Sequence, residues 1–333
     1  MKYSRLSRVV TVGAVLALGL AACSSSSGTA SSSGSAAAGD AGAGSAAADS
    51  GLTIAMITHE TPGDTYWDII KAGAQQAAQQ HGITLKYSSD PDFTKQATLV
   101  QNAIDSKVNG IAMTAAGPEA LKDVVAAANT AKIPVVMFDS GIDDYQKLGA
   151  MMYFGSDEYV AGQALGKKIT EAGGKKALCV IHQEGSVALE ARCKGVGEGV
   201  STENMQVNGT DDASVKASIT AKLQEDPSID YVVTMGAPLA IVALDAIGTA
   251  GSSAKIATFD LNLDAAKAIK EGKIAMAVDA QPYVQGYEAV DSLWRYLTNG
   301  NDIGGGKAVL TGPSIVDASN IDVILPYAEN GTR

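Results

Sequence analysis

Short apolar runs alternate with segments of helical periodicity along nearly the whole chain from residue 52 onward. Each run is followed by a stretch in which apolar residues recur every three or four positions. Because parallel strands need a crossover between them, this order predicts strand–helix–strand units. In the first set we expect strands at 52–58, 83–88, 110–114 and 134–139, with helices at 66–81, 95–107 and 119–131.

The same alternation resumes after a further apolar run at 151–155. Here we expect helices from 158, at 187–200, 215–225 and 239–250, and strands at 177–181, around 205–207, at 231–234 and at 256–260. Each set has the size of one doubly wound domain, and parallel strands require helices on both faces. The fold class predicted is therefore α/β, with two Rossmann-like, doubly wound parallel-sheet lobes.

The N-terminus has the pattern of an export signal. Lys2, Arg5 and Arg8 precede an apolar stretch at 9–20, which leads into Leu20-Ala21-Ala22-Cys23. This stretch is shorter than the roughly 20 residues that a membrane-spanning helix needs. A small-residue site ending in Cys resembles the bacterial lipobox, whose cysteine is lipidated. We therefore predict a signal peptide at 1–22 and lipidation at Cys23, the alternative being a secretory signal followed by a coincidental cysteine.

Residues 23–50 are almost entirely Ser, Ala and Gly, which predicts a flexible tether. The chain has a formal net charge of −11, and loss of the three positive charges in residues 1–22 makes it −14. Nucleic acid is therefore not expected as a partner. The acidic residues are scattered along the chain, so their charge is explained by solubility.

Two cysteines, Cys179 and Cys193, remain after Cys23. In an exported protein they form a plausible disulfide. Metal binding is the alternative, but the histidines at 59, 81 and 182 do not have the spacing of a zinc site. We expect no metal and no cofactor.

Polar residues end several of the predicted strands, and in doubly wound sheets ligands bind at this edge. Asp139 and Asp260 end corresponding strands of the two sets, and the aromatic pair Tyr66-Trp67 opens the first helix. Carboxylates bond to hydroxyl groups, and aromatic faces cover the apolar face of a sugar. Polar residues at strand ends can also simply cap the following helices.

At these positions the chain resembles the type I periplasmic sugar-binding proteins, the ribose- and galactose-binding group, over residues 51–333. The motifs that carry the resemblance are Thr58-His59-Glu60-Thr61-Pro62-Gly63-Asp64-Thr65-Tyr66-Trp67 with Lys71-Ala72-Gly73-Ala74, Ile133-Pro134-Val135-Val136-Met137-Phe138-Asp139, Arg192-Cys193-Lys194-Gly195-Val196, Ala257-Thr258-Phe259-Asp260 and Gln281-Pro282-Tyr283-Val284-Gln285-Gly286-Tyr287. The resemblance implies two lobes joined by a three-segment hinge, with the ligand held between them.

By this resemblance, Arg192 donates to ligand oxygens, Asp260 binds hydroxyls from the second lobe, and Asp279 or Gln281 contacts ligand from the last hinge segment. The candidate ligand-binding residues are His59, Asp64, Tyr66, Trp67, Asp139, Ser140, Arg192, Asn208, Asp211, Gly236, Asp260, Asn262, Asp279 and Gln281. The predicted lobes are 51–156 with 282–312, and 157–281 with 313–333.

Several of these residues have a second interpretation. Asp64 could only cap the first helix, and Trp67 could belong to the core. Arg192 could form a surface ion pair with Glu190 or Glu198, and His59 could satisfy a backbone carbonyl.

The chain also departs from the family pattern. Ser140 stands where ribose-binding members have arginine, Met235-Gly236-Ala237 replaces an asparagine, and Val196 replaces an aromatic residue. The first two changes remove hydrogen-bonding groups, which favours a polyol, a cyclitol or another pentose over ribose.

The sequence thus predicts a monomeric solute-binding lipoprotein on the extracytoplasmic face of the cell membrane. It would capture a small, neutral sugar or polyol and deliver it to an ABC permease. Docking on a chemotaxis or two-component receptor is the alternative. An exported enzyme acting on carbohydrate would need paired carboxylates, which Asp139 and Asp260 could imitate, but no other catalytic motif accompanies them. A DNA-binding regulator of the same fold is excluded by the N-terminal signal.

Overall fold

The computed structural model describes residues 48–333. The predicted signal peptide, the lipidation site Cys23 and the predicted tether up to residue 47 lie outside the described residues. Within the described part of the chain, no helix combines the length and apolar character needed to cross a membrane.

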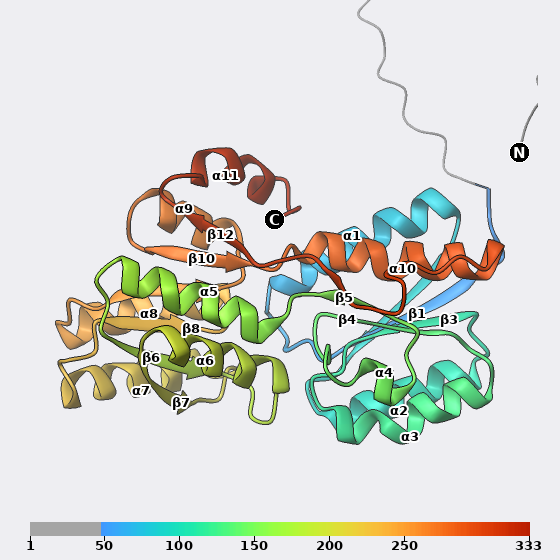
Figure 1. Ribbon diagram of the computed structural model, residues 1–333, viewed down its shortest axis with the longest axis horizontal. Coiled ribbons are helices and arrows are strands. Elements are labelled where there is room, and N and C mark those ends of the chain that lie inside the picture. The colour runs from blue at the N-terminus through green and yellow to red at the C-terminus, as the bar shows by residue number, and fades with distance from the viewer. Residues whose placement is uncertain (1–47) are drawn as a thin grey trace, which may run out of the picture. The chain divides into compact units, whose positions relative to one another are not determined.

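The first lobe is built on a six-stranded parallel sheet with the order β11-β5-β4-β3-β1-β2. Figure 1 shows β1 in blue and β3, β4 and β5 in green, and the last strand of this sheet comes from near the C-terminus. The strands are β1 (Thr53–Thr58), β2 (Thr84–Ser89), β3 (Gly110–Met113), β4 (Val135–Phe138), β5 (Met152–Gly155) and β11 (Val309–Leu310). The helices are α1 (Tyr66–His81), α2 (Phe93–Asp105), α3 (Pro118–Thr130), α4 (Tyr145–Leu148) and α10 (Pro282–Asn299).

The second lobe repeats this plan with the sheet order β12-β10-β9-β8-β6-β7, in which only the β10–β12 pair is antiparallel. Its strands are β6 (Lys176–Ile181), β7 (Ser201–Gln206), β8 (Tyr231–Thr234), β9 (Lys255–Phe259), β10 (Met276–Asp279) and β12 (Ser314–Asp317). Its helices are α5 (Glu158–Glu171), α6 (Val187–Gly199), α7 (Asp212–Glu225), α8 (Ala237–Ala250), α9 (Leu263–Lys270) and α11 (Ile321–Glu329). The two doubly wound lobes predicted from the sequence are confirmed.

The chain passes between the two sheets three times, as the family resemblance implied. The crossings follow β5, β10 and β11, at residues 155–158, 279–282 and 310–314. The exact lobe boundaries stay a prediction.

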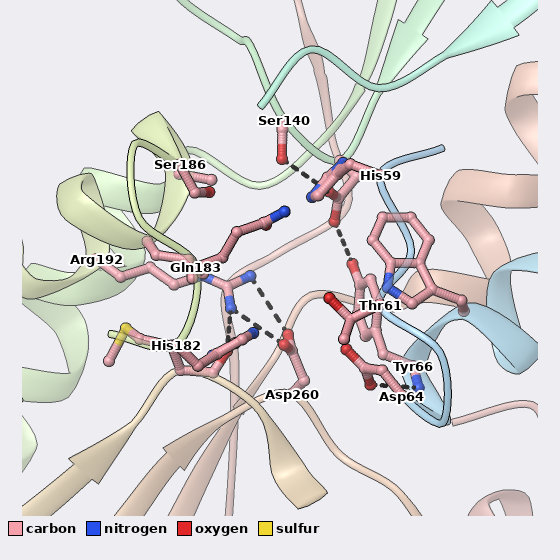
Figure 2. Close-up of a pocket in the computed structure, with 15 residues that line it drawn as sticks. His59, Thr61, Asp64, Tyr66, Ser140, His182, Gln183, Ser186, Arg192 and Asp260 are labelled. Atoms are coloured by element: carbon pink, nitrogen blue, oxygen red, sulfur yellow. Dashed lines mark hydrogen bonds and ion pairs between the residues drawn. The ribbon is translucent and has the colours of Figure 1, made fainter. Parts of the chain in front are cut away.

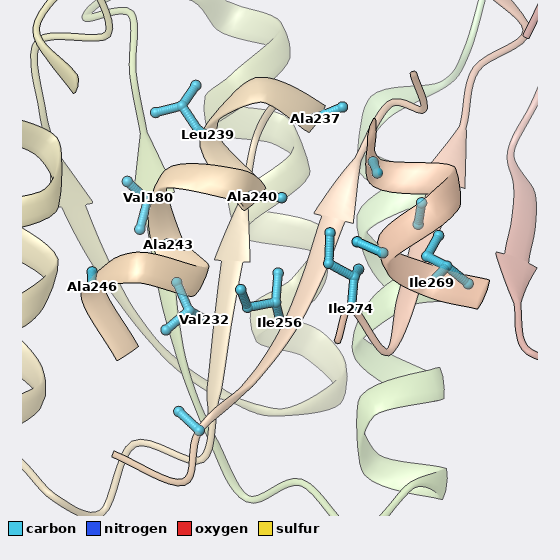
Figure 3. Packing of buried hydrophobic residues seen from close by; sticks show 14 of the residues in the cluster. Val180, Val232, Ala237, Leu239, Ala240, Ala243, Ala246, Ile256, Ile269 and Ile274 are labelled. Carbon is cyan, nitrogen blue, oxygen red and sulfur yellow. The ribbon is translucent and has the colours of Figure 1, made fainter. Parts of the chain in front are cut away.

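Each sheet is buried on both faces, as a parallel sheet requires. In β1, Ile54 and Met56 pack into one hydrophobic cluster, while Ala55 and Ile57 pack into another on the opposite face. This alternation follows from the two-residue period of a strand. In the second lobe, Figure 3 shows Val180, Val232 and Ile256 on the sheet beneath the alanines of α8, whose small side chains bring the helix close to the strands.

Two predicted elements begin at least three residues earlier than expected. The strand predicted around 205–207 spans Ser201–Gln206, and helix α7 begins at Asp212 instead of 215. Strand β7 lies at the edge of its sheet and is largely exposed, so it carries no apolar run to mark its bounds. The helix begins early because the Asp211 carboxylate accepts a hydrogen bond from the backbone N–H of Ser214.

Glycines allow helices α1 and α10 to cross in direct backbone contact. A Cβ atom added to Gly73 would lie 2.0 Å from the carbonyl oxygen of Tyr283, and one added to Gly286 would lie 2.0 Å from that of Ile70. Both glycines belong to motifs that carry the family resemblance. Because backbone atoms cannot move aside individually, any side chain at either position forces the two helices apart.

We expect Gly286→Ala to lower the free energy of unfolding by about 2 kcal/mol, since overpacking of this kind costs roughly 1–3 kcal/mol. Gly248→Ala is the matched control, because Gly248 is exposed in α8 and an added Cβ meets nothing within 4 Å. This change should raise stability by up to about 1 kcal/mol through helix propensity. Urea denaturation of both variants measures the difference, and equal effects would contradict the packing argument.

The predicted disulfide between Cys179 and Cys193 is confirmed in the structure. It joins β6 to α6 inside the core, where both residues are almost completely buried. The bond therefore links the strand that ends at the carboxyl edge of the sheet to the helix that carries Arg192.

We expect the double variant Cys179→Ala, Cys193→Ala to lose about 3 kcal/mol of stability, because a disulfide that closes a loop of about 15 residues restricts the unfolded chain by that amount. Chemical denaturation measures the loss. A thiol count on denatured Cys23→Ser protein provides the control, and two free thiols would show that the bond does not form.

Candidate functional site

A pocket lies at the carboxyl ends of both sheets, where the two lobes face each other. Figure 2 shows residues of the first lobe and of the second lobe on its opposite sides. The lining residues are His59, Thr61, Asp64, Tyr66, Trp67, Asp139, Ser140, His182, Gln183, Ser186, Ala188, Leu189, Arg192, Met235 and Asp260. It encloses about 430 Å³ of empty space, solvent at its mouth included.

Corresponding backbone turns direct Asp139 and Asp260 into the pocket. The two residues directly follow β4 and β9, and both have left-handed backbone conformations, with φ of 65° and 64°. Their backbone N–H groups donate to Phe154 and Val278, respectively. Non-glycine residues rarely adopt this conformation, and it is concentrated at functional sites. The two aspartates were predicted to end corresponding strands of the two lobes. They also share the same left-handed backbone conformation.

In the first lobe, Asp139 is the centre of a hydrogen-bond network. Its two carboxylate oxygens accept from the Tyr66 hydroxyl at 2.7 Å and from the Ser140 hydroxyl at 2.8 Å. His59 Nε2 lies 3.9 Å from the carboxylate, and its Nδ1 is 2.6 Å from the Thr114 hydroxyl. Burial lowers the pKa of His59, although Asp139 opposes this shift. The histidine is therefore neutral and partnered by a side-chain hydroxyl, not by a backbone carbonyl.

Arg192 organises the second lobe's side of the pocket. Its guanidinium group donates to Glu158 Oε2 at 2.5 Å, to the carbonyl oxygen of Met235 at 3.0 Å and to both oxygens of Asp260 at 3.1 and 3.3 Å. The group also lies over the Phe259 ring, 4.8 Å from its centroid.

The alternative of a surface ion pair is wrong for Arg192, because the side chain is only 4% exposed. Helix α6 directs it into the protein, toward Glu158 and Asp260 and away from the exposed Glu190 and Glu198.

The charges around Arg192 are strongly coupled. Burial raises the pKa of Asp260 and that of Glu158, and the Arg192 guanidinium opposes both shifts. Burial lowers the pKa of Arg192, but the two carboxylates outweigh this effect and raise it. The guanidinium therefore stays charged and fixes the orientation of Asp260.

Asp64 and Trp67 each combine a structural role with a place in the pocket. Asp64 Oδ1 accepts from the backbone N–H of Tyr66 at 3.1 Å, so it satisfies the first N–H of α1, although the N-cap position itself is Thr65. Trp67 is 4% exposed and packs in the core, with the His59 ring edge-on at 4.8 Å. Both nevertheless line the pocket.

The other candidate residues do not line this pocket. Asn208 and Asp211 line a neighbouring groove, and Gly236 precedes α8. Asn262 caps α9 by accepting from Ala265 N–H and donates to the Thr65 hydroxyl at 3.0 Å.

At the second crossing between the lobes, the side chains of Asp279 and Gln281 are hydrogen-bonded to other parts of the protein. Arg333 donates to Asp279 at 2.6 Å and to Gln281 at 3.2 Å, and Gln281 donates to the carbonyl oxygen of Thr311 at 2.5 Å. Asp279 is completely buried in this arrangement. Within the structure these two side chains therefore tie two crossing segments together.

Several lining residues are absent from the set of candidate ligand-binding residues predicted from the sequence. Thr61 lies in a motif of the first loop, and His182 and Gln183 directly follow β6, which is the same strand-end signal that identified Asp139. Ser186, Ala188, Leu189 and Met235 carry no such signal. The buried partner Glu158 is separated from Arg192 by 34 positions, and only the contact between α5 and α6 brings them together.

Among residues 48–333, no group of three or more His, Cys, Asp and Glu residues is placed to hold a metal ion. The polar side chains of the site supply carboxylates, hydroxyls, one amide, neutral imidazoles and one guanidinium. Such a set can bind a neutral molecule rich in hydroxyl groups.

Known proteins resemble the chain over most of its length. Residues 54–302 match the family model described as a periplasmic binding protein domain. A carbohydrate transporter from Acidothermus cellulolyticus 11B, solved in complex with myo-inositol, has a TM-score of 0.84 at 54% identity, over 85% of this chain and 99% of that one.

Curated relatives are more distant. The D-apiose import binding protein of Actinobacillus succinogenes is 28% identical over 290 residues, 82% of this chain and 90% of its own. The ribose import binding protein of Salmonella typhimurium is 26% identical over 250 residues, 72% of this chain and 82% of its own.

The ionisation of Asp64 gives a test of the pocket's electrostatics. Burial raises the pKa of Asp64 to about 6 from its usual 3.8. A raised pKa in the folded state stabilises the protein below pH 3.8, and this contribution is lost as the pH rises through about 6. The protein should therefore be less stable than Asp64→Asn at pH 7.5, by up to about 3 kcal/mol, with the difference vanishing toward pH 4.

Urea denaturation of the ligand-free protein at both pH values measures this difference, and the exposed position Asp105→Asn provides the control variant. A difference between protein and Asp64→Asn that does not change with pH would contradict the assignment.

Proposed function

The chain belongs to the family of proteins with a periplasmic binding protein domain, and from this premise we propose that its pocket binds a cyclitol, with myo-inositol as the first candidate. It is a sugar-binding protein of the kind that serves ABC importers. The proposal concerns which hydroxylated ring the pocket selects.

The observation that carries the proposal is the arrangement of hydrogen-bond acceptors around the pocket. The carboxylates of Asp64 and Asp139 come from the first lobe, and that of Asp260 faces them from the second. In a cyclitol every ring position can carry a hydroxyl that donates a proton, whereas the ring oxygen of a sugar can only accept one. Acceptors on both sides of the pocket therefore suit a ring with donors around its whole edge.

The lining residues also exclude some ligands. Among the described residues that line the pocket, Arg192 is the only Lys or Arg, and its charge is already balanced by Asp260 and Glu158. An anionic ligand would face uncompensated carboxylates. Tyr66, Trp67 and His59 supply aromatic rings that lie edge to face with one another, and the face of one such ring can pack against the C–H face of a ligand ring.

The residues that distinguish the chain from the ribose-binding pattern support the same ligand class. Ser140 uses its hydroxyl to bond to Asp139, and the Met235 carbonyl is bonded to Arg192. Neither provides the free donor that the ribose-binding pattern implies there. The relative solved with myo-inositol shares 54% of its residues with this chain, which makes it the nearest guide to the ligand among the proteins compared above.

The relatives that the chain matches are binding proteins, and we propose that this chain too has no catalytic activity. Asp139 is bonded to Tyr66 and Ser140, and Asp260 is bonded to Arg192. Neither carboxylate is placed to exchange a proton freely, as the acid of a glycoside hydrolase must. This geometry favours ligand binding over chemistry.

The remaining parts of the proposal rest on the sequence. We propose that the lobes extend over 51–156 with 282–312 and over 157–281 with 313–333, and that Cys23 anchors a monomeric protein to the outer face of the cell membrane. An anchored binding protein would stay close to its permease.

A thermal-shift screen tests the ligand. At 100 times its dissociation constant, myo-inositol should stabilise the purified protein by about 2.7 kcal/mol, which corresponds to a rise in Tm of several degrees. Ribose at the same concentration should give a smaller shift. A response to ribose alone, or to no cyclitol, would overturn the proposal.

Tyr66→Phe should weaken myo-inositol binding about tenfold, because it removes the hydroxyl that orients Asp139, and such a bond contributes about 1–1.5 kcal/mol. Tyr287→Phe is the matched control, since its hydroxyl bonds to Gln80 on the surface and not in the pocket. Titration calorimetry measures both variants. Equal affinities for the two would show that the Tyr66 hydroxyl has no part in binding.

A further inference from the structure

A second groove adjoins the pocket, and the proposed function gives it no role. We call it the outer groove, and its lining residues are Thr61, Pro62, Gly63, Asp64, His182, Asn208, Gly209, Thr210, Asp211, Asp212, Pro238 and Leu239. It holds about 1190 Å³ of empty space, surrounding solvent included, compared with about 430 Å³ for the pocket. The outer groove therefore has room for at least one further ring.

Three residues line both spaces. Thr61 and Asp64 come from the first lobe, and His182 comes from the second, on the opposite side of the pocket (Figure 2). The pocket and the outer groove consequently meet between these side chains. A substituent on a ligand ring in the pocket can extend into the outer groove at this point.

His182 has an unused hydrogen-bonding atom at the junction. Its Nδ1 is buried and has no hydrogen-bond partner among the described residues. Burial lowers the pKa of His182 to about 4, and the charge of Arg192 adds to this shift, so the ring is neutral. A neutral imidazole has one donor and one acceptor nitrogen: the donor can bond to a hydroxyl or to a glycosidic oxygen, and the acceptor can bond to a hydroxyl.

The position of His182 is fixed by the loop that follows β7. Gly209 N–H donates to the carbonyl oxygen of His182 at 3.1 Å. A Cβ atom on Gly209 would lie 2.9 Å from the Cβ and from the carbonyl oxygen of His182, so only glycine allows the loop this close. The imidazole is therefore held at the junction by backbone contacts from the outer groove itself.

The charges of the outer groove restrict what it can accept. Asp64, Asp211 and Asp212 line it, and its lining residues include neither Lys nor Arg. Although α7 begins at the outer groove, the Asp211 side chain already caps that helix. A phosphate or a carboxylate substituent would be repelled. Pro62, Pro238 and Leu239 offer apolar surface for the C–H face of a neutral sugar.

We propose that the protein also binds cyclitol glycosides, with the cyclitol ring in the pocket and a neutral glycosyl group in the outer groove. This inference rests on the proposed function, because the cyclitol must first occupy the pocket. It extends the ligand class from single rings to conjugates of two rings linked through a hydroxyl near His182.

Titration calorimetry on the purified protein tests the inference with three probes. These are myo-inositol, galactinol, in which a neutral galactosyl group is attached to myo-inositol, and myo-inositol 1-phosphate. Galactinol should bind within about tenfold of myo-inositol, and the phosphate should bind at least about a hundredfold more weakly.

A substitution in the outer groove distinguishes binding in that groove from binding in the pocket. Thr210→Trp should weaken galactinol binding at least about tenfold and leave myo-inositol binding within about twofold, because Thr210 lines the outer groove but not the pocket. Asn204→Trp is the control, since Asn204 is exposed on β7 and lines neither space.

The outcomes distinguish this inference from the proposed function. Binding of myo-inositol without galactinol overturns the inference and leaves the proposed function intact. Galactinol binding that Thr210→Trp does not change shows that the outer groove is not the site, and so also overturns it. If neither myo-inositol nor galactinol binds, both proposals fail.

Discussion

The buried guanidinium group of Arg192 is the interaction on which the binding site depends. It connects the start of α5 through Glu158, the end of β8 through Met235 and the end of β9 through Asp260. These segments are far apart in the sequence, and a buried cation is stable only when carboxylates and carbonyls surround it. Loss of the guanidinium would leave Glu158 and Asp260 buried without their counter-ion. The second lobe's side of the pocket is therefore fixed before any ligand arrives.

The first lobe orients its pocket carboxylate in a different way. Asp139 is oriented by neutral hydroxyl groups, so its charge has no cationic partner comparable to Arg192. With Asp64 nearby, this side of the pocket holds unbalanced acceptors. Ligand hydroxyls can satisfy them. A neutral ligand that bonds to these acceptors and also to Asp260 on the second lobe couples binding to the relative position of the lobes.

The sequence predicted the fold well because its signals were local. Apolar runs located the central strands, since these are buried on both faces, and Asp139 and Asp260 could be identified because each directly follows such a run. Predictions were less successful where contacts are made across the fold. The hydrogen bond from Arg192 to Glu158 forms only because two helices pack together. The hydrogen bond from Arg333 to Asp279 joins residues 54 positions apart. His182 had the same strand-end signal as Asp139, yet its role depends on Gly209 and Gly236, which lie beside its ring in space but not in sequence.

The glycine contact between α1 and α10 has a mechanical consequence. Helix α10 follows the second crossing, yet its backbone touches that of α1 directly, with no flexible side chains between them. Helix α10 is therefore a rigid part of the first lobe, although the chain reaches it only after passing through the second lobe. Any rotation of one lobe against the other must be absorbed by the few residues of the crossings, because α10 cannot slide on α1. The hinge therefore consists of a few residues joined to a rigid lobe. A small change of backbone angle in these residues moves Tyr66, Trp67 and His59 together.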